Sequence, residues 1–257
     1  MLDGMRENRV SQNTALIAHF GFLSVFPLMI VATTLLGFIL RGKPEWREKL
    51  VNSAAEQIPI IGPQLASDPG KLKGNTVVLI IGLLVTLWSG TKAFMAIQNG
   101  MDDIDGVPIE GRMGMARGRL RALIGIGIIG AAQVVTVFLT TLTGIVDWFG
   151  IGEVLLFIAA VIVNVVVVAS IYHWLSTVEA LWRTRLPGAI FAGVIFTVLQ
   201  LIGTTIVQRA ISKASNVYGT FATVIAMLTW LSLHALVALI GAQINRVMRA
   251  QLLTAPQ

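Results

Sequence analysis

Four polar side chains recur inside an apolar run near residue 90, namely Ser89, Lys92, Asn99 and Asp103. Their spacings of three, seven and four residues place them on one face of an α-helix. Polar groups inside a membrane span are costly, so such a face is a candidate pathway for a substrate or an ion. Two structural roles also remain open for Lys92, because its long side chain could reach the membrane surface or form an ion pair.

Other polar side chains lie within separate apolar runs: His19, Gln133, Asn164, Gln200 and His234. Together with Ser89 and Lys92 they could line a polar cavity, or they could form hydrogen bonds between helices. A histidine titrates near neutral pH, so His234 could also couple a proton to transport. The histidines complete no metal-binding motif, and we therefore expect no metal site and no cofactor.

An acidic stretch, "MDDID", ends the run that carries the polar face and contains Asp102, Asp103 and Asp105. These carboxylates could bind a divalent cation, but a solvated loop, or ion pairs with the arginines that follow, is the simpler interpretation. Those arginines are Arg112, Arg117, Arg119 and Arg121. We expect them to fix the topology of the chain and to contact anionic lipid headgroups.

Four further residues are candidates for a gate or an interface: Pro27, Trp88, Tyr218 and Gly219. Pro27 interrupts an apolar run and should kink it. Tyr218 should lie in the belt of aromatic residues at the outer interface. Gly219 permits a tight turn beside it, which could be a packed turn or an outer gate.

The composition is that of a membrane protein. The chain has 257 residues, of which 55% are hydrophobic and 12% charged, and its mean hydropathy is +0.80. Soluble domains carry about 25% charged residues. The net charge of +6 comes from basic residues that flank the apolar runs, which favours contact with lipid over binding of nucleic acid. The absence of cysteine excludes disulfides, thiolate metal sites and a cysteine nucleophile.

Six apolar runs are long enough to cross a bilayer as helices, since about 20 residues span the hydrocarbon core. They lie at about 14–40, 75–99, 119–146, 152–175, 187–208 and 219–245. The first run is too long for the apolar core of a cleavable signal peptide, so we expect it to be a span. The sequence therefore predicts an all-α fold, with one six-helix transmembrane domain over residues 1–257.

The connections between the runs indicate the orientation of the chain. Their arginine and lysine residues favour both termini in the cytoplasm. The first outer connection, which includes "PEWREKLVNSAAEQIPI", repeats apolar residues at helical spacing. We expect a short amphipathic helix there, either as a packed cap or as a lid over an outer opening.

Helix contacts inside lipid depend on small residues that let backbones approach. Four pairs of small residues have the required spacing of four: Gly188 with Ala192, Ala189 with Gly193, Gly127 with Ala131, and Ala222 with Ala226. We expect a packing face at each pair.

Several short motifs occur in a recognisable order. They are Ser24, Phe26, Pro27 and Leu28; Trp88 and Ser89 with Lys92; Leu186, Pro187 and Gly188; Tyr218 and Gly219; Trp230; and Gly241 with Ala242. Together they resemble the YihY/BrkB (YhjD-like) family of bacterial inner-membrane proteins, over nearly the whole chain. Relatives often have an acidic residue after the Gly-Ala pair, where this chain has Gln243. If that acid couples ions in relatives, such coupling is in doubt here.

The resemblance implies a six-helix protein of the bacterial cytoplasmic membrane that is linked to envelope integrity. Some members are associated with export of lipids or lipid-linked envelope components. The family was formerly labelled ribonuclease BN, a label regarded as mistaken, and this sequence offers neither a soluble catalytic domain nor a metal-ligand cluster.

We therefore expect no enzyme, but a transporter or transport component for a lipid-like or amphipathic envelope molecule. A proton- or sodium-coupled carrier of ions or small solutes, or a non-transporting envelope scaffold, are the alternatives. Membrane lipids with anionic headgroups are the expected partners, nucleic acid is not, and the chain could form a homo-oligomer.

Overall fold

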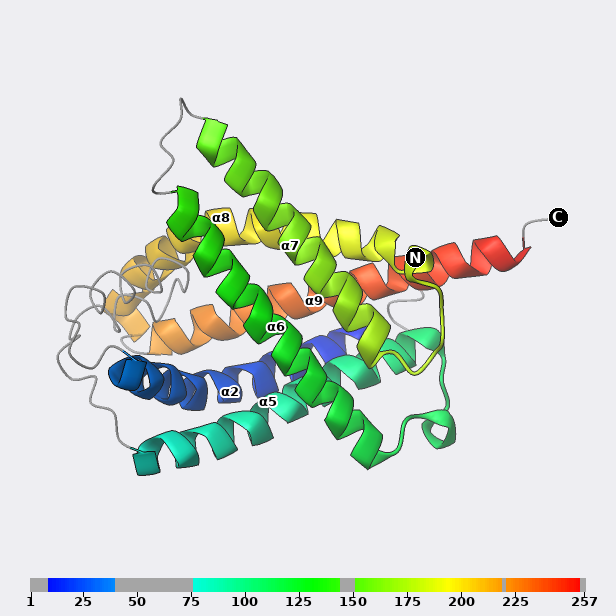
Figure 1. Cartoon of the computed structure of the whole chain (residues 1–257), viewed down its shortest axis with the longest axis horizontal. Helices are drawn as coiled ribbons and strands as arrows, with labels where there is room; N and C mark the ends of the chain where they lie inside the picture. Colours follow the sequence, from blue (N-terminus) through cyan, green and yellow to red (C-terminus); the bar gives the residue numbers. More distant parts are fainter. Residues whose placement is uncertain (1–8, 40–75, 144–150, 219–220, 255–257) are drawn as a thin grey trace. The chain divides into compact units, whose positions relative to one another are not determined.

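The computed structural model describes residues 9–39, 76–143, 151–218 and 221–254. Every regular element in these ranges is helical (Figure 1). The long helices are α2 (Val10–Ile39), α5 (Thr76–Asp105), α6 (Met115–Thr143), α7 (Ile151–Leu175), α8 (Leu186–Tyr218) and α9 (Phe221–Thr254). Two short 3-10 helices, η2 (Ile109–Gly111) and η3 (Trp182–Thr184), lie in the connections. A helix satisfies its backbone groups without water, so apolar runs in lipid become helices. The all-α prediction is confirmed for the described residues.

The predicted spans match these helices in order, but several ends are wrong. α5 continues past the predicted end at 99 to Asp105, so the acidic stretch is helical. α8 continues past 208 to Tyr218, and α9 continues past 245 to Thr254. Hydropathy marks where apolar residues stop, whereas the hydrogen-bonded backbone of a helix can continue into polar residues.

Four stretches in the described residues are long and apolar enough to cross a membrane. They are Leu79–Asp105, Phe157–Leu175, Leu186–Gly203 and Val224–Gln251. α2 and α6 are not among them, so the count of six spans stays a prediction, as does the orientation of the chain. The amphipathic helix expected in the first outer connection lies outside the described residues.

The chain divides into two compact units. Unit 1 contains residues 1–18, 91–198 and 232–257, and unit 2 contains residues 19–90 and 199–231. Among the described residues of unit 2, Met227 is the buried member of an apolar cluster. The side chains packed against it are Phe22, Val25, Ala226, Trp230 and Leu231.

Two glycines bring α8 and α9 close together in unit 1. A Cβ atom added to Gly188 would overlap the carbonyl oxygen of Gly241 and lie 2.7 Å from its carbonyl carbon. Ala189 and Ala192, which follow Gly188 along α8, are fully buried. At Gly193 an added Cβ would lie 2.7 Å from a backbone nitrogen of α7. The predicted packing faces on α8 are therefore confirmed.

The other two predicted pairs have different outcomes. Ala222 is buried and Ala226 is half-buried, but Ala226 contacts Met227 of its own helix, so packing of another helix at this pair stays a prediction. Packing at Gly127 and Ala131 is wrong, since both residues are exposed and a Cβ added to Gly127 would meet no described atom within 4 Å. The spacing of small residues defines a face of α6 but does not say whether another helix covers that face.

Gly188→Ala tests the contact between α8 and α9. The added methyl group collides with backbone that cannot rotate away, and such overpacking costs about 1–3 kcal/mol. We expect a lower thermal unfolding midpoint of the detergent-solubilised protein. The matched control Gly127→Ala adds a methyl group to an open helix face and should leave the midpoint unchanged or raised. Equal midpoints for the two variants would contradict the close contact.

Candidate functional site: an aspartate–arginine cluster

Six charged side chains gather in unit 1 where α5 ends, and we call them the aspartate–arginine cluster. They are Asp102, Asp103, Asp105, Arg112, Arg185 and Arg249. The three carboxylates lie within one turn of α5, so they point in different directions and meet different partners. The arginines come from the connections that follow α5 and precede α8, and from the last part of α9.

Asp102 and Asp103 differ in burial and in their partners. Asp103 forms an ion pair with Arg112 and accepts a hydrogen bond from Asn13 Nδ2 at 2.8 Å. Asp102 is 1% exposed, and its Oδ2 accepts a hydrogen bond from Thr177 Oγ1 at 3.0 Å. Its Oδ1 has no hydrogen-bond partner in the described part of the chain. Pairing with the arginines that follow is therefore confirmed at Asp103, whereas a solvated loop is wrong for Asp102.

Asp105 forms an ion pair with Arg249 of α9. The side chains of Asp105 and Arg249 are 8% and 18% exposed, so this pair is more buried than the one between Asp103 and Arg112. An isolated buried charge costs several kcal/mol, and pairing offsets much of that cost. The Asp105–Arg249 pair therefore links the ends of α5 and α9.

Arg185 is buried immediately before α8 begins. Its guanidinium donates hydrogen bonds to the carbonyl oxygens of Tyr172 and Val178, near the C-terminal end of α7. Arg121 donates to the carbonyl oxygen of Ser176, at 2.8 Å. The last carbonyls of a helix lack partners within the helix, and the helix dipole attracts positive charge there. Two arginines therefore stabilise the end of α7.

The positive charge of Arg185 is only partly compensated. Among the described residues no carboxylate forms an ion pair with Arg185, and its Nε has no hydrogen-bond partner. Burial, together with the nearby Arg249 and Arg121 guanidinium groups, lowers the pKa of Arg185 to about 10, and Asp105 opposes this shift. Arg185 is still protonated at neutral pH. A buried cation therefore remains without a direct anionic partner.

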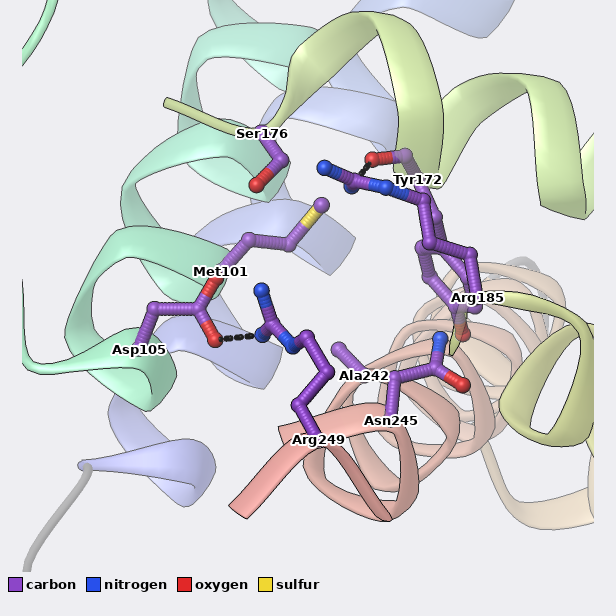
Figure 2. Close-up of a pocket in the computed structure, with 8 residues that line it drawn as sticks. All are labelled: Met101, Asp105, Tyr172, Ser176, Arg185, Ala242, Asn245 and Arg249. Carbon is purple, nitrogen blue, oxygen red and sulfur yellow. Dashed lines mark hydrogen bonds and ion pairs between the residues drawn. The ribbon is translucent and has the colours of Figure 1, made fainter. Parts of the chain in front are cut away.

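A small pocket lies among these groups (Figure 2). Its lining residues are Met101, Asp105, Tyr172, Ser176, Arg185, Ala242, Asn245 and Arg249. Two hydrogen bonds hold its walls: Tyr172 Oη donates to the carbonyl oxygen of Ala238 at 2.5 Å, and Gly188 N donates to Asn245 Oδ1 at 2.7 Å. The cavity volume is about 10 Å³, which leaves room for about one water molecule.

The chemistry that this site offers is that of ion pairs and charged hydrogen bonds. Within the described residues, no group of three or more histidine, cysteine or acidic side chains is arranged to hold a metal ion. Arginine presents a planar fork of donors that suits carboxylate and phosphate oxygens. The cluster can therefore exchange one anionic partner for another without covalent chemistry.

The predicted polar face of α5 does not form a single lining. Ser89 is buried, but its hydroxyl donates to backbone carbonyls of its own helix. Lys92 and Asn99 are exposed. Asp103 belongs to the cluster, yet none of these four side chains lines the pocket. Their role in a pathway stays a prediction.

Asn164 and His234 make contacts between helices in unit 1. Asn164 Nδ2 donates a hydrogen bond to Thr197 Oγ1 at 2.9 Å, which joins α7 to α8. The interhelical hydrogen bond predicted for Asn164 is therefore confirmed. His234 stacks on Phe196, with ring centroids 5.1 Å apart. A cavity that Asn164 and His234 share with Lys92 stays a prediction.

The other pathway candidates lie at separate places along the chain. His19 is exposed and contacts Phe20 edge-on, with ring centroids 5.5 Å apart. Gln200 is exposed, and the side chain of Gln133 lies outside the described residues. Their participation in a pathway is therefore untested.

The gate and interface candidates are described only in part. Trp88 is 63% exposed on α5. α2 continues as a helix through Pro27, and Tyr218 is the last residue of α8, but the side chains of both lie outside the described residues. Gly219 itself lies outside them.

The four arginines predicted to contact lipid headgroups fall into two groups. Arg117 and Arg119 are exposed, as a headgroup contact requires. Arg112 pairs with Asp103, and Arg121 caps α7, so these two make contacts within the protein. Headgroup binding by any of them stays a prediction.

Sequence reasoning missed the roles of Arg185, Arg249, Thr177 and Asn245. Both arginines flank apolar runs, so they indicated only the topology of the chain. A basic residue beside a span looks the same in sequence whether it faces lipid headgroups or a buried carboxylate. The available signal was the three nearby carboxylates, which need cations when they are buried.

Arg185→Met tests the capping of α7. It removes two hydrogen bonds from a charged donor and leaves the Tyr172 carbonyl without this partner, so we expect a loss of about 2–3 kcal/mol in stability. Thermal unfolding in detergent measures the loss, and hydrogen exchange should become faster at the end of α7. Arg183→Met is the matched control, since Arg183 is exposed two residues away. Equal effects of the two substitutions would refute the capping role.

Comparison with known proteins places this chain in a family. The family described as virulence factor BrkB matches residues 1–256. The UPF0761 membrane protein Smlt0865 of Stenotrophomonas maltophilia (strain K279a) is 24% identical over 266 residues, which cover 95% of this chain and 58% of that protein. The uncharacterized protein Dda3937_02003 of Dickeya dadantii (strain 3937) is 24% identical over 250 residues, 89% of this chain and 75% of that protein. No solved structure matches the chain. The chain, with its long apolar helices, belongs to the BrkB family of membrane proteins.

Proposed function

We propose that this protein transports a lipid-like or amphipathic envelope molecule across the bacterial cytoplasmic membrane, alone or as a component, without enzymatic activity. The aspartate–arginine cluster carries the proposal. Charged groups among membrane-spanning helices are costly, which makes them functional candidates by default. Ion pairs can separate and form again, so a cluster of them can close one end of a helical bundle and still open.

Opening would separate α5 from α9, because the Asp105–Arg249 pair joins the ends of these two helices. Arg185 would remain with α7, to which it is tied through carbonyl oxygens and not through a carboxylate. The predicted orientation would put this closure at the cytoplasmic end. In this proposal, membrane lipids surround the protein and also supply the molecule that it transports.

A proton- or sodium-coupled carrier is the second candidate, and one observation favours it. Asp102 is 1% exposed, and its Oδ1 has no partner in the described residues. Such an oxygen calls for an explanation, such as a proton, an ion or a water molecule. The binding and release of that species could drive a transport cycle.

Transport of a fluorescent phospholipid between the leaflets of proteoliposomes tests the first proposal. We expect wild-type protein to move the lipid, and Arg249→Gln to slow it at least about tenfold, because a bundle whose closing ion pair cannot form no longer alternates between its closed and open states. The exposed control Arg183→Gln should keep the wild-type rate. Absence of lipid movement by the wild type, with unchanged envelope composition in cells lacking the protein, would refute lipid transport and favour a scaffold.

The same vesicles separate the second candidate from the first. A rate that follows an imposed proton or sodium gradient in the wild type, but not in Asp102→Asn, would favour a coupled carrier. A rate that ignores both gradients would exclude it.

A further inference from the structure

The pocket in the aspartate–arginine cluster has an unbalanced charge. Two guanidinium groups, of Arg185 and Arg249, line it together with one carboxylate, of Asp105. Two further arginines lie close to these groups, Arg121 near Arg185 and Arg246 near Asp105, and one further carboxylate, of Asp102, lies near Asp105. The groups around the pocket therefore carry a net positive charge, which would attract an anion.

The pocket wall also contains N–H groups that are available to donate a hydrogen bond to a ligand. Arg185 is 4% exposed, and its Nε has no hydrogen-bond partner in the described part of the chain. Asn245 uses its amide oxygen to accept from Gly188 N, so its amide nitrogen is the group that can donate to a ligand. Figure 2 shows Arg249 held by Asp105 and Arg185 held against Tyr172 around the same pocket. A buried donor without an acceptor indicates a missing partner.

We propose that this pocket binds a phosphate group, which Arg249 and Arg185 hold after Arg249 releases Asp105. The inference rests on the proposed transport function, for which it supplies the recognised part of the cargo. Phosphate suits the arginine fork, which can donate two parallel hydrogen bonds to its oxygens. A lipid headgroup and a free phosphate ester share this chemistry.

The pocket has room for about one water molecule, so a phosphate group enters only when the Asp105–Arg249 pair opens. Asp105 and the ligand therefore compete for the same guanidinium. This competition predicts that removing the Asp105 charge tightens binding, a result that a purely structural ion pair would not give.

Binding to the full chain in neutral detergent tests the proposal by isothermal titration calorimetry. The probes are dihexanoyl phosphatidic acid, glycerol 3-phosphate, and dihexanoyl glycerol as the neutral lipid. We expect the wild type to bind a phosphate-bearing probe and not the neutral one. Asp105→Asn should lower the Kd about tenfold and Arg249→Gln should raise it at least tenfold, each reflecting one charged hydrogen bond. Arg183→Gln, an exposed charge loss two residues from Arg185, should leave the Kd unchanged.

Binding of phosphatidic acid alone identifies a lipid headgroup as the source, whereas equal binding of glycerol 3-phosphate identifies a free ester. Weaker or unchanged binding by Asp105→Asn, or equal weakening by Arg249→Gln and Arg183→Gln, would overturn the proposal. If Arg249→Gln does not fold, the Kd of Asp105→Asn is sufficient to test the proposal. A protein that binds phosphate but moves no lipid refutes transport and leaves the pocket intact. A protein that moves lipid but binds no phosphate refutes the pocket.

Discussion

Arg185 is buried against the end of α7, and the arrangement of unit 1 depends on how its charge is stabilised. A cation in a low-dielectric interior needs acceptors, and the carbonyl oxygens of Tyr172 and Val178 supply them. The same contact gives partners to carbonyl groups that the end of α7 cannot satisfy within the helix. α8 begins one residue after Arg185, and near its start Gly188 approaches Gly241 of α9. One side chain therefore connects the end of one helix to the close packing of two others.

The other charges of the cluster are stabilised differently, and this difference bears on function. Asp105 and Arg249 join the ends of α5 and α9 through an ion pair, and the side chain of Leu239 on α9 packs close to Gly100 on α5. α8 and α9 are held by backbone contact and by the hydrogen bond between Gly188 and Asn245, which would be lost together on separation. An ion pair can exchange its partner for another anion of similar geometry, whereas packed backbone cannot. We therefore expect α5 and α9 to separate before α8 and α9 do.

The sequence was sufficient for the helices and for some of their contacts. A long, continuous apolar run in lipid forms an α-helix, because a helix satisfies its own backbone hydrogen bonds. The all-α fold and the order of the helices therefore followed from hydropathy. The packing of Gly188 and the hydrogen bond of Asn164 followed from residue size and polarity. The resemblance to the BrkB family is confirmed over residues 1–256. The pairing of Asp103 with Arg112 was expected, but the rest of the cluster was not predictable, because Asp102 and Arg249 lie at the ends of apolar runs, where charged residues normally meet water. Burial there is a tertiary property that neither charge nor spacing reveals.

The separation of α5 from α9 is the central claim, and a reversible cross-link tests it directly. A Cβ atom added to Gly100 of α5 would lie 2.9 Å from Leu239 Cδ2 of α9, and the chain has no cysteine of its own. Gly100→Cys combined with Leu239→Cys places two thiols at this contact, and a disulfide between them, verified on a non-reducing gel before the assay, joins the two helices. Lipid movement in proteoliposomes should stop when the disulfide forms and return when it is reduced. A cross-linked protein that moves lipid as fast as the reduced one would contradict the account.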